Sequence, residues 1–385
     1  MTTEWWGSAR SADALAAWRT LERRLGGLPL MCSADWTEIW LRHYGPSIPH
    51  RFVIGRSAEG QVVALLLLAR GAEDRDGPFA LRTWHLGTAG EPDADSVVVE
   101  YNAVACEPAY RDAFLADVLQ GLLAESDWDE LRCDGFAADD TPACLTPESG
   151  WLQLQKRARW TDLDRVRESG QELLKFLGDS TRKNIRQNLR DCGAVSVEVP
   201  RSTDEAHAFF DELMALHQQR WNSEGRPGCY ASRVFSAFHR ELIDRMSEDG
   251  RLLLIRVRAG NTTLGCTQYL IDRGRALNYQ GGRQIGAQRL SPGLLTDYLG
   301  MQACLDRGYS AYDFLAGDSI HKQRLTTETT PLNWLTLRRP RWKFALMQQL
   351  RECRRWTTAW LGSRRSGAES RVADSPIAHL GRPLQ

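Results

Sequence analysis

The chain has 385 residues, with 49 acidic and 49 basic side chains and 42% hydrophobic residues. This is ordinary globular composition for two or three domains, and it contains no run of about 18 apolar residues that would predict a transmembrane helix. The first ten residues lack the apolar stretch of a secretory signal. The nine cysteines are scattered without a Cys-x-x-Cys pair; a disulfide framework and a zinc site are therefore not expected, and we predict a cytoplasmic protein.

Helices and strands alternate along the first half of the chain. We predict helices over residues 11–25, 36–44 and 110–125, the second of them opened by Ser33 or Asp35. Strands are predicted over residues 51–55, 61–68, 81–86, 96–99 and 130–133. A loop rich in Asp, Thr and Pro at 137–150 marks a boundary, and a transitional strand at 151–163 follows it.

The second half repeats this pattern. We predict helices over residues 171–176, 180–190 with Ser180 as cap, 203–221, 232–247 and 292–307, and strands over 195–199, 252–258, 263–272, 276–281 and 310–315. Each half thus contains helices, an antiparallel meander, a helix and a strand, which predicts two related α+β domains. The end of the chain differs: residues 340–361 read as a basic helix, and residues 363–385 have a composition typical of disorder.

Charge is divided unevenly between the halves. Residues 1–160 carry 15 Lys and Arg against 24 Asp and Glu, a net charge of −9, and residues 161–385 carry 34 against 25, a net charge of +9. A basic half suits a polyanionic ligand such as a nucleotide cofactor, a nucleic acid or an anionic membrane, and charge alone does not choose among them.

The most informative segment joins a strand to a helix. The strand ends in Tyr279, Gln280, Gly281, Gly282 and Arg283, and the helix opens with Arg289, Ser291, Pro292, Gly293 and Leu294. Ser291 is expected as N-cap and Pro292 as the first helical residue. The unpaired N–H groups and positive dipole of a helix start hold anions, and Gly293 leaves room for a phosphate. Because Ser-Pro-Gly also opens helices that bind nothing, the pyrophosphate site of coenzyme A is a hypothesis at this point.

A carboxylate is predicted inside the last strand. Asp313 lies between Tyr312 and Phe314, where an unpaired charge is costly, so it is either functional or part of a buried ion pair with Lys322 or a nearby arginine. Asp318, His321 and Lys322 follow within a few residues.

These motifs resemble the GNAT acyltransferases, in particular the CelD-like branch, named for a protein of cellulose biosynthesis and similar to the Fem-type aminoacyltransferases with two GNAT domains in tandem. The similarity rests on Phe176-Leu177 through Arg190, on His217-x-x-Arg220-Trp221, on Pro292 to Leu295, and on Tyr312 to Asp318 followed by Lys322. It covers residues 160–330 well and the first half more loosely. His321 and Leu325 depart from it, because a tyrosine and a tryptophan are usual there.

The resemblance implies an α+β fold of two tandem GNAT-like domains, each a mixed, mostly antiparallel sheet flanked by helices. Residues 1–160 would form the acceptor side and residues 161–345 the acyl-CoA domain, followed by a basic amphipathic helix at 346–362 and a disordered tail at 363–385. The implied reaction moves an acyl group from acetyl-CoA or another acyl-CoA to an amine of a small molecule, sugar or amino acid, without a metal.

Such a reaction needs an oriented amine, a proton acceptor and stabilisation of an oxyanion. Backbone N–H groups around Gln280 to Gly282 are expected to polarise the thioester carbonyl. The general base stays open among Asp313, Asp318 and His321, and Tyr279 or Tyr312 is a candidate for protonating the thiolate.

Three other features have two interpretations each. His217, Arg220 and Trp221 share a helix and either line the acceptor pocket or serve packing. The helix carrying Arg182, Lys183, Arg186 and Arg190 either grips phosphates or presents a solvated basic face, and without aromatic residues interleaved in it we expect no nucleic-acid partner. The basic C-terminal helix either lies on an anionic membrane or packs on the domain.

Two other functions remain open. A Fem-like enzyme would take its acyl group from an aminoacyl-tRNA, and a silent GNAT-like protein would act as a partner of a polysaccharide or secondary-metabolite assembly. The sequence leaves the oligomeric state undetermined.

Overall fold

The computed structural model describes residues 1–285 and 291–352. The chain divides into two compact units. The larger contains residues 1–74 and 82–338, and the smaller contains residues 75–81 and the chain from Arg339 onward. Arg289 and the tail at 363–385, both named above, lie outside the described residues.

The larger unit is built on one 13-stranded sheet, in the order β1-β2-β3-β6-β8-β15-β9-β14-β13-β12-β11-β10 with β7 paired to β3. The first half supplies β1 (Thr2–Gly7), β2 (His50–Arg56), β3 (Val62–Arg70), β6 (Thr83–Leu86), β7 (Ala105–Cys106), β8 (Glu130–Ala137) and β9 (Leu152–Asp162). The second half supplies β10 (Val195–Glu198), β11 (Leu252–Ala259), β12 (Thr262–Asp272), β13 (Arg275–Arg283), β14 (Ala311–Ala316) and β15 (Glu328–Arg338).

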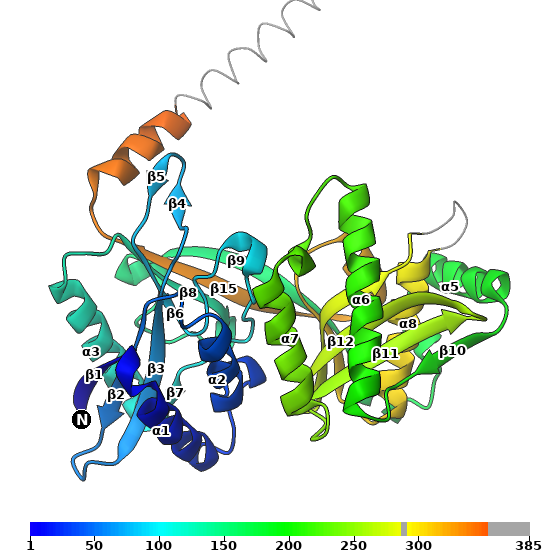
Figure 1. Cartoon of the computed structure of the whole chain (residues 1–385), viewed down its shortest axis with the longest axis horizontal. Coiled ribbons are helices and arrows are strands. Elements are labelled where there is room, and N and C mark those ends of the chain that lie inside the picture. Colours follow the sequence, from blue (N-terminus) through cyan, green and yellow to red (C-terminus); the bar gives the residue numbers. More distant parts are fainter. Residues whose placement is uncertain (286–290, 353–385) are drawn as a thin grey trace, which may run out of the picture. The chain divides into compact units, whose positions relative to one another are not determined.

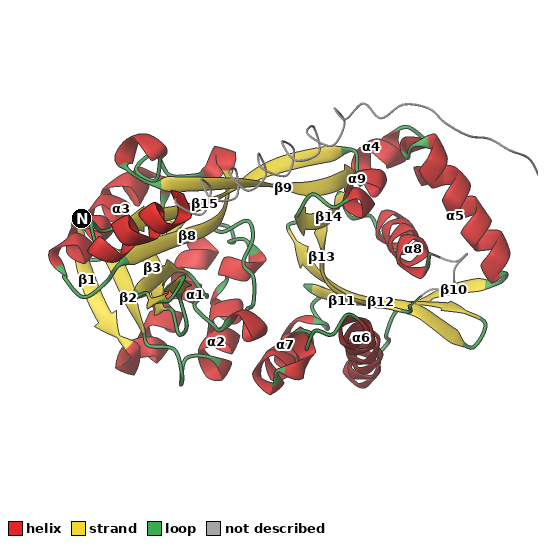
Figure 2. Ribbon diagram, turned by 90° about the horizontal axis from the view of Figure 1, so that it is seen from above, coloured by secondary structure: helices red, strands yellow, loops and turns green. Residues whose placement is uncertain are grey.

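The helices of this unit occupy both faces of the sheet. They are α1 (Ser11–Arg24), α2 (Ala34–His43), α3 (Arg111–Ala124), α4 (Leu163–Glu168), α5 (Asp179–Cys192), α6 (Thr203–Ser223), α7 (Arg233–Met246), α8 (Pro292–Asp306) and α9 (Ile320–Leu325). In the second half, α6 and α7 lie on one face of the strands and α5 and α8 on the other (Figure 2).

The two halves repeat one topology, as the sequence predicts. In the first half the antiparallel strands β2, β3 and β6 are followed by α3 and by β8, which pairs parallel to β6. In the second half β11, β12 and β13 are followed by α8 and by β14, which pairs parallel to β13. A mixed, mostly antiparallel sheet flanked by helices is therefore confirmed for each half.

The last strand of each half pairs with strands of the other half. Strand β9 pairs with β14, and β15 returns to pair with β8 as well as with β9 (Figure 1). Residue 160, the predicted domain boundary, falls inside β9. The sheet consequently runs without interruption through both halves, and the division at that residue stays a prediction.

A shared hydrophobic core also joins the halves. Trp36 of α2 meets the rings of Phe238 and Tyr279 edge to face, with ring centroids 5.0 and 5.9 Å apart. Trp36 and Phe238 are both fully buried. Since fully burying a large apolar side chain contributes about 1.5–3 kcal/mol, this cluster stabilises the contact between the halves.

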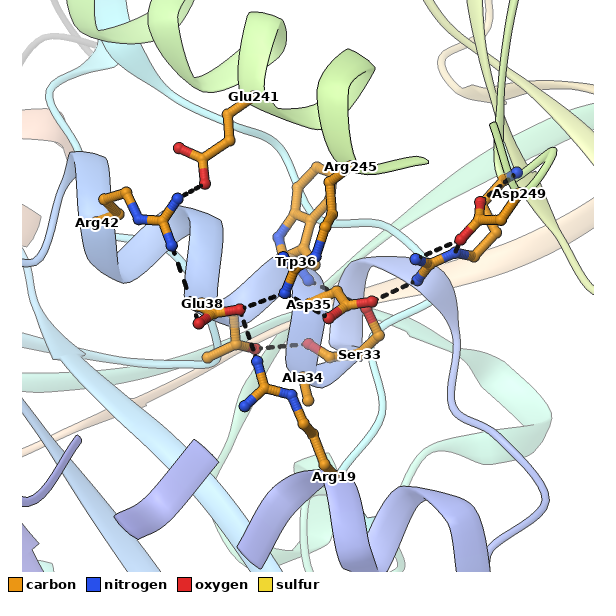
Figure 3. Close-up of polar contacts among 12 residues, drawn as sticks. Arg19, Ser33, Ala34, Asp35, Trp36, Glu38, Arg42, Glu241, Arg245 and Asp249 are labelled. Atoms are coloured by element: carbon orange, nitrogen blue, oxygen red, sulfur yellow. Dashed lines mark hydrogen bonds and ion pairs between the residues drawn. The ribbon is translucent and has the colours of Figure 1, made fainter. Parts of the chain in front are cut away.

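Ion pairs between α2 and α7 surround that core (Figure 3). Arg245 contacts Glu38 at 2.7 Å and Asp35 at 3.3 Å, and Arg42 pairs with Glu241. These side chains are partly exposed, so each pair contributes only about 0–1 kcal/mol. Their effect is to fix how the two helices align rather than to hold them together.

Several predicted elements differ from the structure at their ends. Helix α2 begins with Ser33 as N-cap, which accepts a hydrogen bond from the Trp36 N–H. Helix α5 begins at Asp179 after Gly178, so Ser180 is not its cap, and no side chain caps this helix. Residues 171–176 contain only a short 3-10 helix at Leu173–Phe176. Residues 96–99, predicted as a strand, form no strand and no ladder with the sheet.

The smaller unit pairs a hairpin with a helix. Strands β4 (Arg75–Asp76) and β5 (Phe79–Ala80) form the hairpin, and residues 342–352 are helical. Trp342 packs on Phe79 with ring centroids 5.3 Å apart and is still 70% exposed. The predicted contact of this basic segment with an anionic membrane stays a prediction.

Candidate active site

The site begins where two parallel neighbours in the sheet separate. Strands β13 and β14 pair only from Arg275 to Leu277 and from Ala311 to Asp313. Tyr279 is an extra residue in the ladder with β12 and forms a β-bulge. A bulge redirects side chains and breaks pairing. Within the described chain, residues 278–283 consequently have no strand partner on the β14 side, and those of their backbone polar groups that do not bond to β12 face an opening.

A cavity of about 340 Å³ fills this opening. Five of the predicted site residues line it: Tyr279, Gln280, Gly281, His321 and Lys322. The lining also includes Asp297 of α8 and, from the first half of the chain, Val98 and Glu100. Both halves therefore contribute to one cavity.

A histidine and a buried carboxylate form a pair at the cavity wall. The Nε2 atom of His321 lies 2.5 Å from Oδ2 of Asp297. Asp297 is fully buried, whereas the His321 side chain is 41% exposed. When the imidazole donates from Nε2, its Nδ1 atom is left to accept a proton. This is the geometry of a histidine base oriented by a carboxylate.

Asp297 is ionised despite its burial. Its Oδ1 atom accepts from Nη2 of Arg283 at 2.5 Å and from Nδ2 of Asn278 at 3.2 Å. Burial alone raises the pKa of a carboxyl, but the charges of Arg283 and His321 outweigh it and lower the pKa of Asp297. Sequence reasoning missed Asp297, although a single carboxylate among the apolar residues of α8 before Asp306 was an available signal.

Helix α8 starts beside the cavity. Pro292 is its first residue as predicted, and Ser291 occupies the N-cap position without a side-chain capping bond. The Ser291 N–H instead donates to Oδ1 of Asn188 at 2.8 Å, which brings α5 against this end of α8. A β-carbon added to Gly293 would lie 3.0 Å from Cδ of Arg283. Leu294, the next residue, is half-buried against the core of the second half.

Asp313 is placed away from the cavity lining and is fully bonded. It accepts from the Tyr101 hydroxyl at 2.6 Å, from Nη2 of Arg275 at 2.6 Å and from the Leu315 N–H at 2.7 Å. Its partner is therefore Arg275 and not Lys322. These contacts are those of a buried ion pair that holds the end of β14.

Hydrogen bonds from Lys322 also stabilise the end of β14. Its Nζ atom donates to the carbonyl oxygens of Phe314, Leu315 and Ala316 at 2.7, 3.2 and 2.7 Å. Leu315 has φ of 61°, a left-handed conformation that a leucine adopts only under tertiary constraint. Asp318 is exposed and pairs with Arg159 of β9. The closing motif thus forms a constrained loop, and His321 and Lys322 are its two predicted catalytic residues that line the cavity.

The predicted acceptor residues of α6 form contacts within that helix, and Arg220 is exposed. The Nε2 atom of His217 accepts from Nε1 of Trp221 at 2.9 Å, and Arg220 pairs with Glu224 at 3.2 Å. None of these three helix residues lines either cavity described in this section. Gly282 is needed for another reason, since an added β-carbon would lie 2.1 Å from the backbone oxygen of Leu213 in α6.

A second cavity of about 610 Å³ adjoins the first. The two share Val98, Glu100 and Ala316 as lining residues. Glu100 is 7% exposed, and its Oε2 atom accepts from the Ala316 N–H at 2.5 Å. Burial raises the pKa of Glu100 to about 7.

In the described residues no three His, Cys, Asp or Glu side chains are arranged to hold a metal ion. The described cysteines are all free thiols. No helix within the described ranges is both long and apolar enough to cross a membrane.

Comparisons with known proteins identify the fold. Residues 179–323 match the family of acetyltransferase (GNAT) domains. The structure resembles that of FemX with a TM-score of 0.51 at 15% identity, covering 86% of this chain and 97% of FemX. It resembles equally the C-terminal domain of a putative lysylphosphatidylglycerol synthetase from Agrobacterium fabrum, with a TM-score of 0.51 at 12% identity, covering 85% and 92% of the two chains. No curated protein matches the sequence.

Residues 179–323 therefore form a domain of the GNAT acetyltransferase type, and the fold of the chain is similar to that of FemX.

Proposed function

We propose that this protein is an acyl-CoA-dependent N-acyltransferase that uses direct attack of an amine on the thioester. The observation that carries the proposal is the Asp297–His321 pair in the opening between β13 and β14, next to the start of α8. One site then combines a base, unpaired backbone groups and an anion-binding helix end.

The donor would be held at the start of α8. The first N–H groups of this 15-residue helix have no intrahelical acceptor, and its dipole adds positive potential. Basic residues of the neighbouring α5, including the exposed Lys183, Arg186 and Arg190, add charge on the same side. Gly293 leaves space there for a pyrophosphate. The charged groups that line the 610 Å³ cavity are mainly carboxylates, which repel phosphates. We therefore assign the donor phosphates to the start of α8 and the acceptor to the side of the 610 Å³ cavity.

The reaction proceeds in three steps on this geometry. His321 accepts a proton from the amine while the amine nitrogen attacks the thioester carbonyl, and Asp297 stabilises the imidazolium that forms. N–H groups of residues 280–283 stabilise the oxyanion. Collapse of the tetrahedral intermediate then forms the amide and expels the CoA thiolate.

Tyr279 is the candidate that would protonate the thiolate. Its hydroxyl donates to the Val98 carbonyl oxygen at 3.2 Å, and burial raises its pKa well above the ordinary value, which keeps it protonated. Lys322 is excluded as the base in this scheme, because its ammonium is committed to three carbonyl oxygens.

The first half would complete the acceptor side. It contributes Val98 and Glu100 to the reaction cavity and most of the lining of the adjoining one. Since β15 and the core are shared between the halves, the second half by itself would lose part of its own fold. We therefore place the acceptor site on the intact chain.

An aminoacyl-tRNA donor is the second candidate, supported by the exposed basic face of α5 and by the FemX-like fold. Ribonuclease treatment abolishes transfer if this candidate holds and leaves it unchanged if the donor is acyl-CoA. A silent scaffold is disfavoured by the His321–Asp297 pair, which such a protein would have no reason to keep.

The experiment that tests the proposal is calorimetric titration with acetyl-CoA and longer acyl-CoAs. Gly293→Glu places a carboxylate at the start of α8 and should abolish binding. Gly7→Glu is the matched control, because a β-carbon at Gly7 meets nothing within 4 Å and its φ of −74° suits any residue. Absence of binding to the wild type, or equal binding by Gly293→Glu and Gly7→Glu, would refute the proposed donor site.

A further inference from the structure

The 610 Å³ cavity beside the reaction site is strongly acidic. Its walls carry the carboxyl groups of Asp74, Glu91, Asp93, Glu100 and Asp134, against the cationic side chains of Arg132 and Lys156 and the imidazole of His85. All of its lining lies in the larger unit. Its volume is within the range of small-molecule sites, about 300–1,000 Å³.

The cations of the cavity are already engaged. Asp74 pairs with His85 at 2.9 Å and with Arg132 at 3.0 Å, and Arg132 also contacts Glu130 at 2.6 Å. Lys156 places its Nζ atom 4.0 Å from the centroid of the Trp334 ring. Lys322, whose Nζ atom is bonded to three carbonyl oxygens, also acts on Glu100. Among the side chains that line the cavity, Lys156 is the one cation without a carboxylate partner.

Two of these carboxyl groups are buried with one oxygen unused. Glu91 is 9% and Glu100 is 7% exposed. Glu91 accepts from Nε1 of Trp40 through Oε1, and Glu100 accepts from the Ala316 N–H through Oε2. Among the described residues the second oxygen of each has no hydrogen-bond donor. Neither of these two oxygens is among the buried side-chain atoms that lack a partner, so each is open to the cavity and can accept a hydrogen bond from a ligand there.

We propose that this cavity binds a second ammonium group of the acceptor, which is therefore a diamine or polyamine. Another primary amine of the same molecule lies in the reaction cavity, which adjoins this one at Glu100. This inference rests on the proposed acyl transfer, because the reacting amine is the one beside His321. Carboxylates repel phosphates, so the donor nucleotide is not the occupant. An ammonium has three donors, which matches the unused oxygens of Glu91, Glu100 and Asp134.

The pH dependence of binding follows from burial. Burial raises the pKa of both Glu91 and Glu100 to about 7, whereas alkyl ammonium groups stay charged to about pH 10. As the pH rises from 6 to 8 these two carboxyls ionise, and we expect diamine binding to tighten. Asp93, Asp134, His85, Arg132, Asp74 and Lys156 also face the cavity. The charges of Lys322 and Asp313 act on Glu100 as well, and that of Asp95 acts on Glu91.

The test measures binding to the full chain without any acyl-CoA. The probes are α,ω-diaminoalkanes of three to eight carbons, each compared with the amino alcohol of the same length, by calorimetry at pH 8. We expect a diamine to bind at least about tenfold more tightly than its amino alcohol, since a charge-assisted hydrogen bond contributes that much or more. Equal affinities, or no diamine binding at millimolar concentration, would overturn the inference.

Variants locate the effect. Asp134→Asn and Asp93→Asn each remove one carboxylate from the cavity, and Asp93 lies exposed on a short 3-10 helix, so its replacement should not impair folding. Asp13→Asn is the matched control, because Asp13 is a 63% exposed surface residue of α1. We expect weaker diamine binding in both cavity variants and unchanged binding in the control. Unchanged binding in both cavity variants would refute the site.

The inference and the proposed function fail separately. Diamine binding without acyl transfer would support the ammonium site and refute the proposed acyltransferase function. Acyl transfer to amino alcohols and diamines at equal kcat/KM would support the enzyme and overturn the ammonium site.

Discussion

Replacement of His321 by glutamine tests the proposed base directly. Glutamine keeps an N–H donor for Asp297, so the buried carboxylate retains its partner, but it accepts no proton near neutral pH. General base catalysis contributes about 10²–10⁴-fold, which corresponds to about 2.7–5.4 kcal/mol in the activation barrier. We therefore expect kcat for His321→Gln to fall by that factor.

Stability and donor binding should stay almost unchanged in this variant. The His321 side chain is 41% exposed, and exchange of one hydrogen-bond donor for another changes the free energy of unfolding by about 1 kcal/mol or less. The assay follows release of the CoA thiol at saturating acyl-CoA, with calorimetry for donor affinity. His207→Gln is the control, because His207 is a surface residue of α6 bonded to Asp244. A kcat within threefold of the wild type would remove His321 from the mechanism.

Three other expectations concern stability, each measured by urea unfolding. Lys322→Met should cost about 2–4 kcal/mol, because three carbonyl oxygens lose their shared donor; an unchanged unfolding midpoint with lost activity would make Lys322 catalytic instead. Burial raises the pKa of Glu91 from 4.5 to about 7. The stability that Glu91 contributes in its neutral form is therefore fully present below pH 4.5 and is lost as the pH rises through 7. Glu91→Gln should therefore gain on the order of 3 kcal/mol over the wild type at pH 8 and nothing at pH 4.5; a gain independent of pH would contradict this. Gly282→Ala should destabilise by about 3 kcal/mol or more, because its β-carbon would lie 2.1 Å from a backbone oxygen. Gly7→Ala, whose β-carbon meets nothing within 4 Å, should be tolerated; similar losses for both would refute the packing argument.

Much of the candidate site was within reach of the sequence. Pro292 and Gly293 were predicted at a helix start, and Tyr279, Gln280, Gly281, His321 and Lys322 were predicted together and line one cavity. The predictions were possible because turn glycines, a proline at N1 and short motif spacings act through neighbours in the chain.

Long-range contacts decided the surroundings of other predicted residues. The close approach of α6 requires a glycine at 282, and the cofactor role of Gly282 stays a prediction. Lys322 or a nearby arginine was predicted as the partner of Asp313; the partner is Arg275, 38 positions away, together with Tyr101 of the other half. Such contacts depend on which strands become neighbours, and local patterns carry no information about that choice.

The sequence alone determined that two halves repeat one order of helices and strands, because hydrophobic periodicity and turn residues act locally. Tertiary structure decided the rest. Three features arise from long-range packing: the exchange of β9 and β15, the pairing of Asp297 with His321 across 24 positions, and the acidic cavity, whose lining comes from segments between Asp74 and Trp334. Burial raises the pKa of Glu91 and Glu100, whereas the charges of Arg283 and His321 lower the pKa of Asp297 despite its burial.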